Sequence, residues 1–187
     1  MPNSPLHTAR SAVFLDRDGV INVKLPKDHY VASSEDFRFL PGAVEALAIL
    51  KSMGYLLVVV TNQRGIGRNL MTEEDLESVH RFMEEELAKA GVRLDGIYHC
   101  PHDEQECCDC RKPKPGMIIR ACRDLNIDIS RSYMVGDSSC DVAAGKSVGM
   151  KTVRIGEAVD ENADMVFGSL QEFASHMKRT YRESRSA

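Results

Sequence analysis

Metal-binding side chains crowd into one short stretch of the sequence, residues 100–110. This stretch contains four cysteines and one histidine, and it leads directly into the cations Arg111 and Lys112. It could form a redox centre, a structural zinc site or one wall of a larger active site. Three thiolates and one neutral imidazole make a closed tetrahedral zinc site. The set that we expect is Cys100, His102, Cys108 and Cys110.

Alternatives to this ligand set remain open. Cys107 could replace Cys108, and it also forms a C-x-x-C pair with Cys110. A redox dithiol of the thioredoxin type belongs at the start of a helix, however, whereas this pair lies in a loop rich in proline and aspartate. His99 could replace His102, but it falls within a strand pattern. The expected zinc is structural, because all four positions are filled, and it would order a loop that has almost no aliphatic side chains.

Carboxylates form a second candidate site, at the ends of two predicted strands. Asp16 and Asp18 follow one strand, and Asp137 and Asp141 follow another. Side chains two residues apart point to the same side of an extended chain, so Asp16 and Asp18 can face one small volume. Several carboxylates without cations would repel one another and raise each other's pKa. Hard oxygen ligands of this kind suit Mg²⁺.

The elements that must position these residues alternate between strand and helix. Strands are predicted at 11–16, 55–61, 95–100, 132–137, 151–155 and 163–167, with helices at 41–54, 72–90, 115–127 and 141–149 and a last one from a cap at 169–172. Thr72 begins a capping box, and one apolar helix face follows it: Leu76, Val79, Met83, Leu87 and Ala90. The alternation predicts a Rossmann-like parallel α/β sheet with helices on both faces, in which ligands bind beyond the carboxyl ends of the strands.

Composition and charge place limits on the class of protein. The chain has 187 residues, and we expect residues 1–187 to form a single domain with flexible ends at 1–10 and 181–187. The net charge of −4 gives no basic footprint for nucleic acid. No apolar run reaches the roughly 18 residues of a membrane span, and no secretory signal is visible. We therefore expect a cytoplasmic monomer without nucleic-acid or membrane partners, in which cysteines stay reduced.

Four of these sequence features together resemble the haloacid dehalogenase superfamily of phosphohydrolases. They are Asp16-Arg-Asp18-Gly-Val20, Thr61 at a strand end, Lys112 and Gly136-Asp137-Ser-Ser-Cys-Asp141, in the order of that superfamily. The resemblance implies that Asp16 attacks phosphorus and forms an aspartyl-phosphate, while Asp18 acts as general acid and base. It also implies that Thr61 and Lys112 hold the phosphoryl oxygens. Mg²⁺ would lie between Asp16, the backbone carbonyl of Asp18 and Asp137, below a minimal cap of short loops that includes the zinc loop.

A narrower resemblance extends over residues 12–149. The segments DRDGVIN, VVVTNQRGIGR, DGIYHCPH, CDCRKPKPGM and SYMVGD are similar to the branch that removes a phosphate from a heptose bisphosphate, in the synthesis of nucleotide-activated heptose for lipopolysaccharide or surface glycans. The substrate implied is a phosphorylated sugar, bordered by Asn22, Asn62, Arg64 and Arg111. Histidinol-phosphate phosphatase relatives share the cysteine block and give an alternative. The third hypothesis is a catalytically silent, zinc-bearing binding protein on the same fold. The presence of both Asp16 and Asp18 argues against it.

Overall fold

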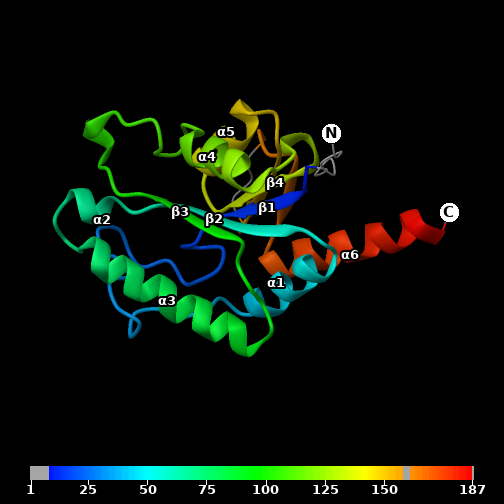
Figure 1. The fold of residues 1–187 in the computed structure, drawn as a ribbon, viewed down its shortest axis with the longest axis horizontal. Helices are drawn as coiled ribbons and strands as arrows, with labels where there is room; N and C mark the ends of the chain where they lie inside the picture. Colours follow the sequence, from blue (N-terminus) through cyan, green and yellow to red (C-terminus); the bar gives the residue numbers. More distant parts are fainter. Residues whose placement is uncertain (1–8, 158–160, 187) are drawn as a thin grey trace, which may run out of the picture.

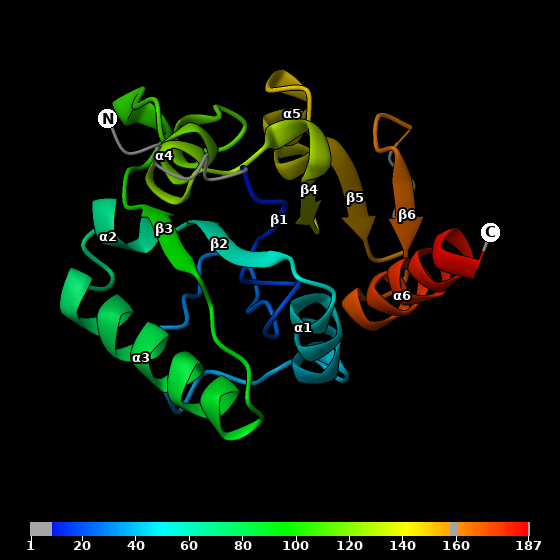
Figure 2. The same ribbon diagram turned by 45° about the vertical axis from the view of Figure 1, so that its right-hand side comes forward.

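The computed structural model describes residues 9–157 and 161–186. The strands of this part of the chain form one six-stranded sheet, which is parallel as predicted from the sequence. The order of the strands is β3-β2-β1-β4-β5-β6. Figure 2 shows them spread across the molecule from β3 to β6. They are β1 (Ala12–Leu15), β2 (Leu56–Asn62), β3 (Gly96–Cys100), β4 (Tyr133–Gly136), β5 (Lys151–Ile155) and β6 (Met165–Phe167).

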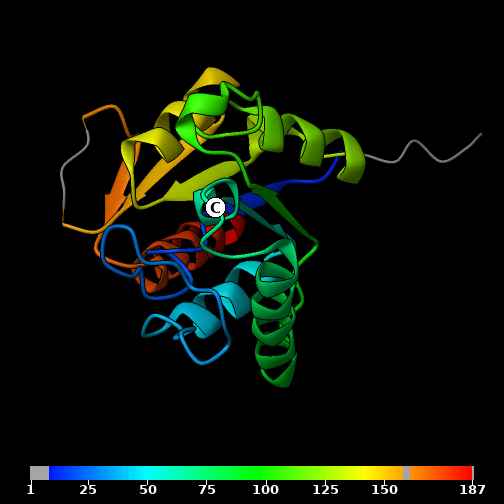
Figure 3. The ribbon, with the colours of Figure 1, turned by 90° about the vertical axis from the view of Figure 1, so that its left-hand side faces the viewer.

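Helices cover both faces of this sheet. One layer holds α1 (Ala43–Ser52), α3 (Glu73–Lys89) and α6 (Leu170–Ser186), and the other holds α4 (Gly116–Leu125) and α5 (Ser139–Ser147). Figures 1 and 3 show the two layers on opposite sides of the strands. Short helical turns complete the described chain: α2 (Arg64–Gly67), η1 (Glu104–Glu106) and η2 (Ile129–Arg131).

The central strands β1 and β2 are apolar on both sides because both faces of the sheet are buried there. In β1, Val13 and Leu15 pack into the layer of α1, α3 and α6, whereas Ala12 and Phe14 pack against α4 and α5. All four side chains are fully buried. Continuous hydrophobic runs of this kind are typical of parallel sheets between two helical layers. They leave the strand ends as the places where polar side chains can gather.

Helix α3 confirms the predicted cap and most of the predicted face. Thr72 Oγ1 accepts a hydrogen bond from Asp75 N–H, and the Asp75 carboxylate accepts one from Thr72 N–H. The buried positions are Leu76, Val79, Met83 and Leu87. The prediction for Ala90 was wrong: it is the C-cap and is exposed, because the helix ends at Lys89 and the chain turns away through Gly91.

The order of the strands determines where a ligand can bind. The chain passes from β1 to β2 and β3 on one side, and then returns to β4 on the other side of β1. The crevice at such a reversal, outside the carboxyl ends of the strands, is the usual ligand site of open α/β sheets. Here it lies at the ends of β1 and β4. The long connections after β1 (23–42) and β3 (101–115) carry side chains to its rim.

The two ends of the chain were predicted to be flexible. Residues 1–8 and Ala187 lie outside the described residues. Arg10 pairs with Ile127 in a short parallel bridge, and residues 181–186 continue α6. Arg10 and residues 181–186 therefore belong to defined backbone structure. Across residues 9–157 and 161–186, every helix is too short or too polar to cross a membrane.

Candidate active site

Asp16 and Asp137 meet at the crevice between β1 and β4. Each directly follows its strand, and the backbone N–H of Asp16 donates to the Val135 carbonyl at 2.9 Å, which keeps the two strand ends in register. Gly19 allows the turn after β1 to lie directly against the Asp137 side chain. It has a positive φ of 91°, and a Cβ at this position would lie 2.4 Å from Asp137 Oδ2. A larger residue at position 19 would therefore clash with the Asp137 carboxylate and displace it.

Lys112 is the cation of this site. Its Nζ lies 3.0 Å from Asp16 Oδ1 and 2.7 Å from Asp141 Oδ1, and it donates to the Val60 carbonyl at 2.6 Å. The residue is only 3% exposed, so almost all of its charge is compensated by protein groups. Asn62 exchanges two hydrogen bonds with the backbone of Lys112, at 3.0 and 3.1 Å, and thereby fixes it against the end of β2.

Burial and neighbouring charges shift the pKa values of this pair. Burial, together with the Asp141 and Asp18 charges, raises the pKa of Asp16 to about 7, although Lys112 opposes the shift. For Lys112, burial lowers the pKa, but the Asp16 and Asp141 carboxylates outweigh it and raise the pKa above its ordinary value. Lys112 is therefore a permanent cation. Further positive charge close to Asp16 would favour the ionised form of this carboxyl group.

Asp18 belongs to a different set of partners. Arg17 NH2 donates to both of its carboxylate oxygens at 3.0 Å, Asn22 Nδ2 donates to Oδ1 at 2.9 Å and Gln63 Nε2 donates to Oδ2 at 3.0 Å. Burial acts to raise the pKa of Asp18, but the Arg17 charge and these hydrogen bonds bring it below its usual range. Asp16 and Asp18 thus line one cavity in different electrostatic environments.

The sequence-based prediction for Asn22 needs correction. It was expected to border the sugar, but it is fully buried and its amide donates to Asp18 and to the Val23 carbonyl. The cause is the tight turn after β1, in which the backbone N–H groups of Ile21 and Asn22 both donate to the Arg17 carbonyl. This turn directs Asn22 inward behind Asp18.

Three carboxylates have oxygens close enough together to hold a divalent ion. Oxygens of Asp16, Asp137 and Asp141 lie within 4.8 Å of one another. Asp137 Oδ1 is buried without a hydrogen-bond partner, while its Oδ2 pairs with Lys24 at 2.6 Å. A buried carboxylate oxygen left unpaired is costly, so this oxygen fits a cation ligand. The set of hard oxygens suits Mg²⁺, and the Asp18 side chain is not part of it.

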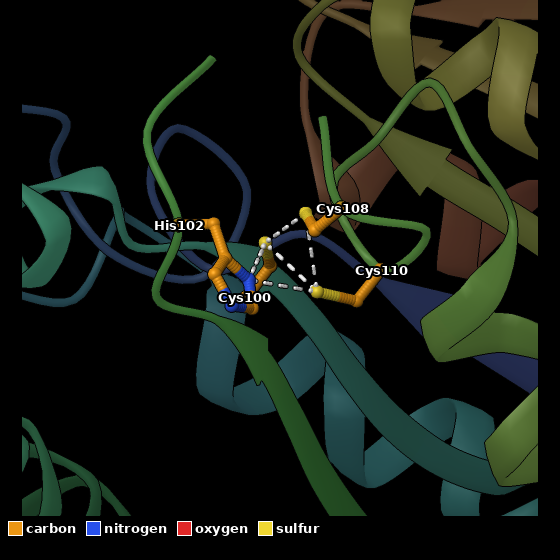
Figure 4. A group of neighbouring side chains, drawn as sticks. All are labelled: Cys100, His102, Cys108 and Cys110. Carbon is orange, nitrogen blue, oxygen red and sulfur yellow. Dashed lines mark hydrogen bonds between the residues drawn. The ribbon is translucent and has the colours of Figure 1, made fainter. Parts of the chain in front are cut away.

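The four predicted zinc ligands lie together at the end of β3 and in the loop that follows it. Figure 4 shows the side chains of Cys100, His102, Cys108 and Cys110 pointing toward one point. Their sulfur atoms are separated by 3.1, 3.4 and 3.5 Å, and His102 Nδ1 lies 3.2 Å from Cys110 Sγ. Bonded sulfurs would be about 2.05 Å apart, so these are free thiols. Cys107 is exposed and outside the group, and the donors fit Zn²⁺.

Two arginines lie at the rim of the cavity, Arg111 from the same loop and Arg64 from the start of α2. The cavity measures about 280 Å³ and is lined by Asp16, Asp18, Thr61, Asn62, Arg64, Arg111 and Lys112, among others. Arg111 donates to Glu104 at 3.1 Å, and Arg64 lies 3.5 Å from the same carboxylate. The two rim arginines thus share the Glu104 carboxylate, and Arg64 also pairs with Asp28 at 3.2 Å. The rim is a place where a second anion can bind.

Sequence reasoning missed some residues of the site. Gln63 is buried and donates to both Asp18 and Thr61 Oγ1, so it ties the ends of β1 and β2 together. The two-residue alternation used for Asp16 and Asp18 could have found it, since Gln63 stands two positions after Thr61. Lys24 had no such signal, because it comes from an irregular loop.

Comparison with known proteins agrees with this geometry. A family model described as haloacid dehalogenase-like hydrolase matches residues 5–149, most of the chain. The chain belongs to the haloacid dehalogenase-like hydrolases, as the strand-end motifs predicted. Phosphomonoester hydrolysis is the activity that the family and the site together support.

Relatives within this family narrow the comparison. A curated D-glycero-beta-D-manno-heptose-1,7-bisphosphate 7-phosphatase of Vibrio cholerae is 46% identical over 186 residues, which cover 91% of this chain and 98% of that protein. The protein of the same name from Pasteurella multocida is 46% identical over 163 residues, or 82% and 86% of the two chains. The crystal structure of D,D-heptose 1.7-bisphosphate phosphatase from B. bronchiseptica, complexed with magnesium and phosphate, superposes with a TM-score of 0.84. It is 30% identical and the alignment covers 91% of this chain and 99% of that one.

Proposed function

We propose that this chain removes the 7-phosphate of D-glycero-D-manno-heptose 1,7-bisphosphate through an aspartyl-phosphate. One observation carries the chemistry: Asp16 lies 3.0 Å from a buried lysine and close to Asp137, whose Oδ1 is buried without a hydrogen-bond partner. The relatives of the preceding comparison supply the substrate. The product would serve the synthesis of nucleotide-activated heptose for lipopolysaccharide or surface glycans. Histidinol phosphate is the alternative substrate.

The first step forms the covalent intermediate. An oxygen of Asp16 attacks phosphorus in line, a new O–P bond forms, and the bond between phosphorus and the sugar oxygen breaks. Lys112 and Thr61 hold the oxygens of the transferring group, where their charge and hydroxyl neutralise the developing charge. Asp18 gives a proton to the leaving sugar oxygen. The phosphate dianion beside Asp18 favours its protonated form, because a nearby like charge raises the pKa of a carboxyl group.

The second step releases phosphate. Water attacks the phosphorus of the aspartyl-phosphate, Asp18 takes the proton from this water, and the Asp16 carboxylate is regenerated. The hydrogen bonds of Asp18 to Arg17, Asn22 and Gln63 hold it in the ionised form that this second role requires. General acid and base help of this type is typically worth about 10²–10⁴-fold in rate.

The residues that would hold Mg²⁺ are Asp16, Asp137 and the backbone carbonyl of Asp18. When bound, the ion supplies positive charge that keeps Asp16 ionised and screens it from the phosphate. Asp141 acts from behind through Lys112. Zn²⁺ would be held by the Cys100 cluster of Figure 4 and would order the loop that carries Arg111 and Lys112.

Arg64, Arg111 and Asn62 border the space for the rest of the substrate. A guanidinium forms paired hydrogen bonds with phosphate, so Arg64 and Arg111 suit the second phosphate of a bisphosphate. We also propose that residues 1–187 act as one domain with a minimal loop cap. The monomeric state and the cytoplasmic location stay predictions from the sequence.

Parallel phosphate-release assays with Mg²⁺ test the substrate. We expect kcat/KM for the heptose bisphosphate to exceed that for histidinol phosphate by at least about 10²-fold, because buried polar groups reject a substrate that leaves them unpaired. Phosphorus NMR should show loss of the 7-phosphate alone. Preference for histidinol phosphate would establish the alternative. Hydrolysis of neither compound would indicate a silent binding protein.

A further inference from the structure

Arg17 is a fully buried cation between the two catalytic aspartates of the sequence. Its side chain is 0% exposed, and it is the largest such side chain in the described core. Its Nε lies 3.3 Å from Asp18 Oδ1, and its NH2 donates to both oxygens of that carboxylate. Burying a charge without partners is very costly, so the position of Arg17 depends on every group that accepts its N–H bonds.

His80 is the partner on the far side of this guanidinium. It lies on the buried face of α3, is 8% exposed, and its Nε2 is 3.3 Å from Arg17 NH1. Arginine has only donors and stays protonated in proteins, so His80 Nε2 must be the acceptor. His80 is therefore neutral and carries its hydrogen on Nδ1. This helix residue lies outside the cavity and does not touch substrate space.

The two contacts fix the guanidinium in one plane. Nε and NH2 point to Asp18, and NH1 points to His80. Without an acceptor at NH1, the guanidinium could rotate to find another partner, and the paired contact with Asp18 would lose its geometry. A misplacement of a catalytic group by about 1 Å can cost about 10²-fold in rate. The orientation of Asp18 thus depends on a residue of α3.

We propose that His80 is a positioning residue for proton transfer, acting through Arg17 on Asp18. The proposal rests on the proposed function, in which Asp18 protonates the leaving oxygen. A sugar alkoxide is a poor leaving group that needs this proton, whereas a nitrophenolate leaves without it. Loss of His80 should therefore harm hydrolysis of the sugar phosphate far more than hydrolysis of 4-nitrophenyl phosphate.

Two substitutions of His80 test whether this residue positions Asp18 through Arg17. His80→Leu fills the volume but removes the acceptor, and His80→Gln keeps an acceptor near the place of Nε2. For His80→Leu we expect kcat/KM to fall about tenfold or more for heptose bisphosphate and within about threefold for 4-nitrophenyl phosphate. For His80→Gln we expect most of the activity to return. The ratio of the two substrates on one preparation is independent of how much protein is folded.

The outcomes separate the inference from the proposed function. Equal losses on both substrates, no loss on either, or no rescue by His80→Gln would overturn the inference. Asp18→Asn is the control for the mechanism, and it should lose activity more strongly on the sugar phosphate. If Asp18→Asn keeps full activity on both substrates, the proposed mechanism fails and the inference fails with it. If Asp18→Asn loses activity while His80→Leu does not, only the inference fails.

Discussion

Lys112 Nζ lies 3.0 Å from Asp16 Oδ1, although the two residues belong to the third and the first of the four sequence motifs. Lys112 follows Cys110 by two residues, so the loop that contains the cluster of Cys100, His102, Cys108 and Cys110 also brings the buried cation to Asp16. This contact links the opening feature of the sequence to the carboxylate site. We therefore expect activity to depend on the integrity of the Cys100, His102, Cys108 and Cys110 cluster.

Replacement of the nucleophile gives the most direct test of the covalent mechanism. Asp16→Asn keeps the shape of the side chain but removes the attacking oxygen, so we expect kcat to fall by at least about 10³-fold. Phosphate release from heptose bisphosphate measures the change. Asp109→Asn changes a fully exposed carboxylate and serves as a control with unchanged activity. Unimpaired turnover by Asp16→Asn would disprove the aspartyl-phosphate.

Loss of the buried cation should affect both activity and stability. Lys112→Met leaves the carboxylates of Asp16 and Asp141 without their shared partner. We expect kcat/KM to fall at least about 10²-fold and the free energy of unfolding to fall by about 3–5 kcal/mol. Urea denaturation and phosphate release measure the two effects. Lys89→Met, on the exposed side of α3, is the control and should change neither; a similar change in both variants would argue against a special role.

The metal cluster can be tested by a pair of adjacent cysteines. Cys108 lies within the four-ligand group, whereas Cys107 is exposed beside it. We expect about one zinc per chain in the wild type and in Cys107→Ser, and loss of most zinc in Cys108→Ser. Metal analysis by mass spectrometry measures the content, and activity should fall with it because the loop carries Lys112. Equal zinc in both variants would assign the ligand set differently.

The rim arginines allow a matched comparison of binding. Arg64 and Arg68 both pair with Asp28, but only Arg64 lines the cavity. We expect Arg64→Ala to raise KM for heptose bisphosphate about tenfold with little change in kcat, because a charged hydrogen bond contributes about 1.5–3 kcal/mol. Arg68→Ala should leave KM unchanged. A rise of the same size in both variants would attribute the effect to the loop around Asp28 instead.

The lowered pKa of His80 should make the stability of the protein depend on pH. Burial, and then the Arg17 charge, lower the pKa of His80 to about 3 in the folded protein, against 6.5 ordinarily. Between these values the unfolded chain binds the extra proton, so stability is lost as pH falls from about 6.5 to about 3, by up to about 1.4 kcal/mol per pH unit. Urea denaturation at several pH values measures this slope. The free energy of unfolding of His80→Gln should depend less steeply on pH than that of the wild type. An equal slope in the wild type and the variant would exclude His80 as the source of the pH dependence.

The sequence by itself determined the order of the elements and the chemical type of both sites. Buried apolar runs alternate with amphipathic segments, and this local pattern is sufficient to predict a parallel sheet and polar strand ends. The spacing of Asp16 with Asp18, and of Cys108 with Cys110, is also local. These residues were found because their chemistry depends on near neighbours in the chain.

Only the tertiary structure decided which side chains point into the cavity and which support it from behind. Asn22 turns inward behind Asp18, and Arg17 joins Asp18 to His80 on a helix far along the chain. The pKa values of Asp16 and Lys112 likewise depend on burial and on charges from separate strands. Such contacts depend on how the helices and the sheet pack against each other in three dimensions. Neither the hydrophobic periodicity nor the spacing of residues in the sequence can predict them.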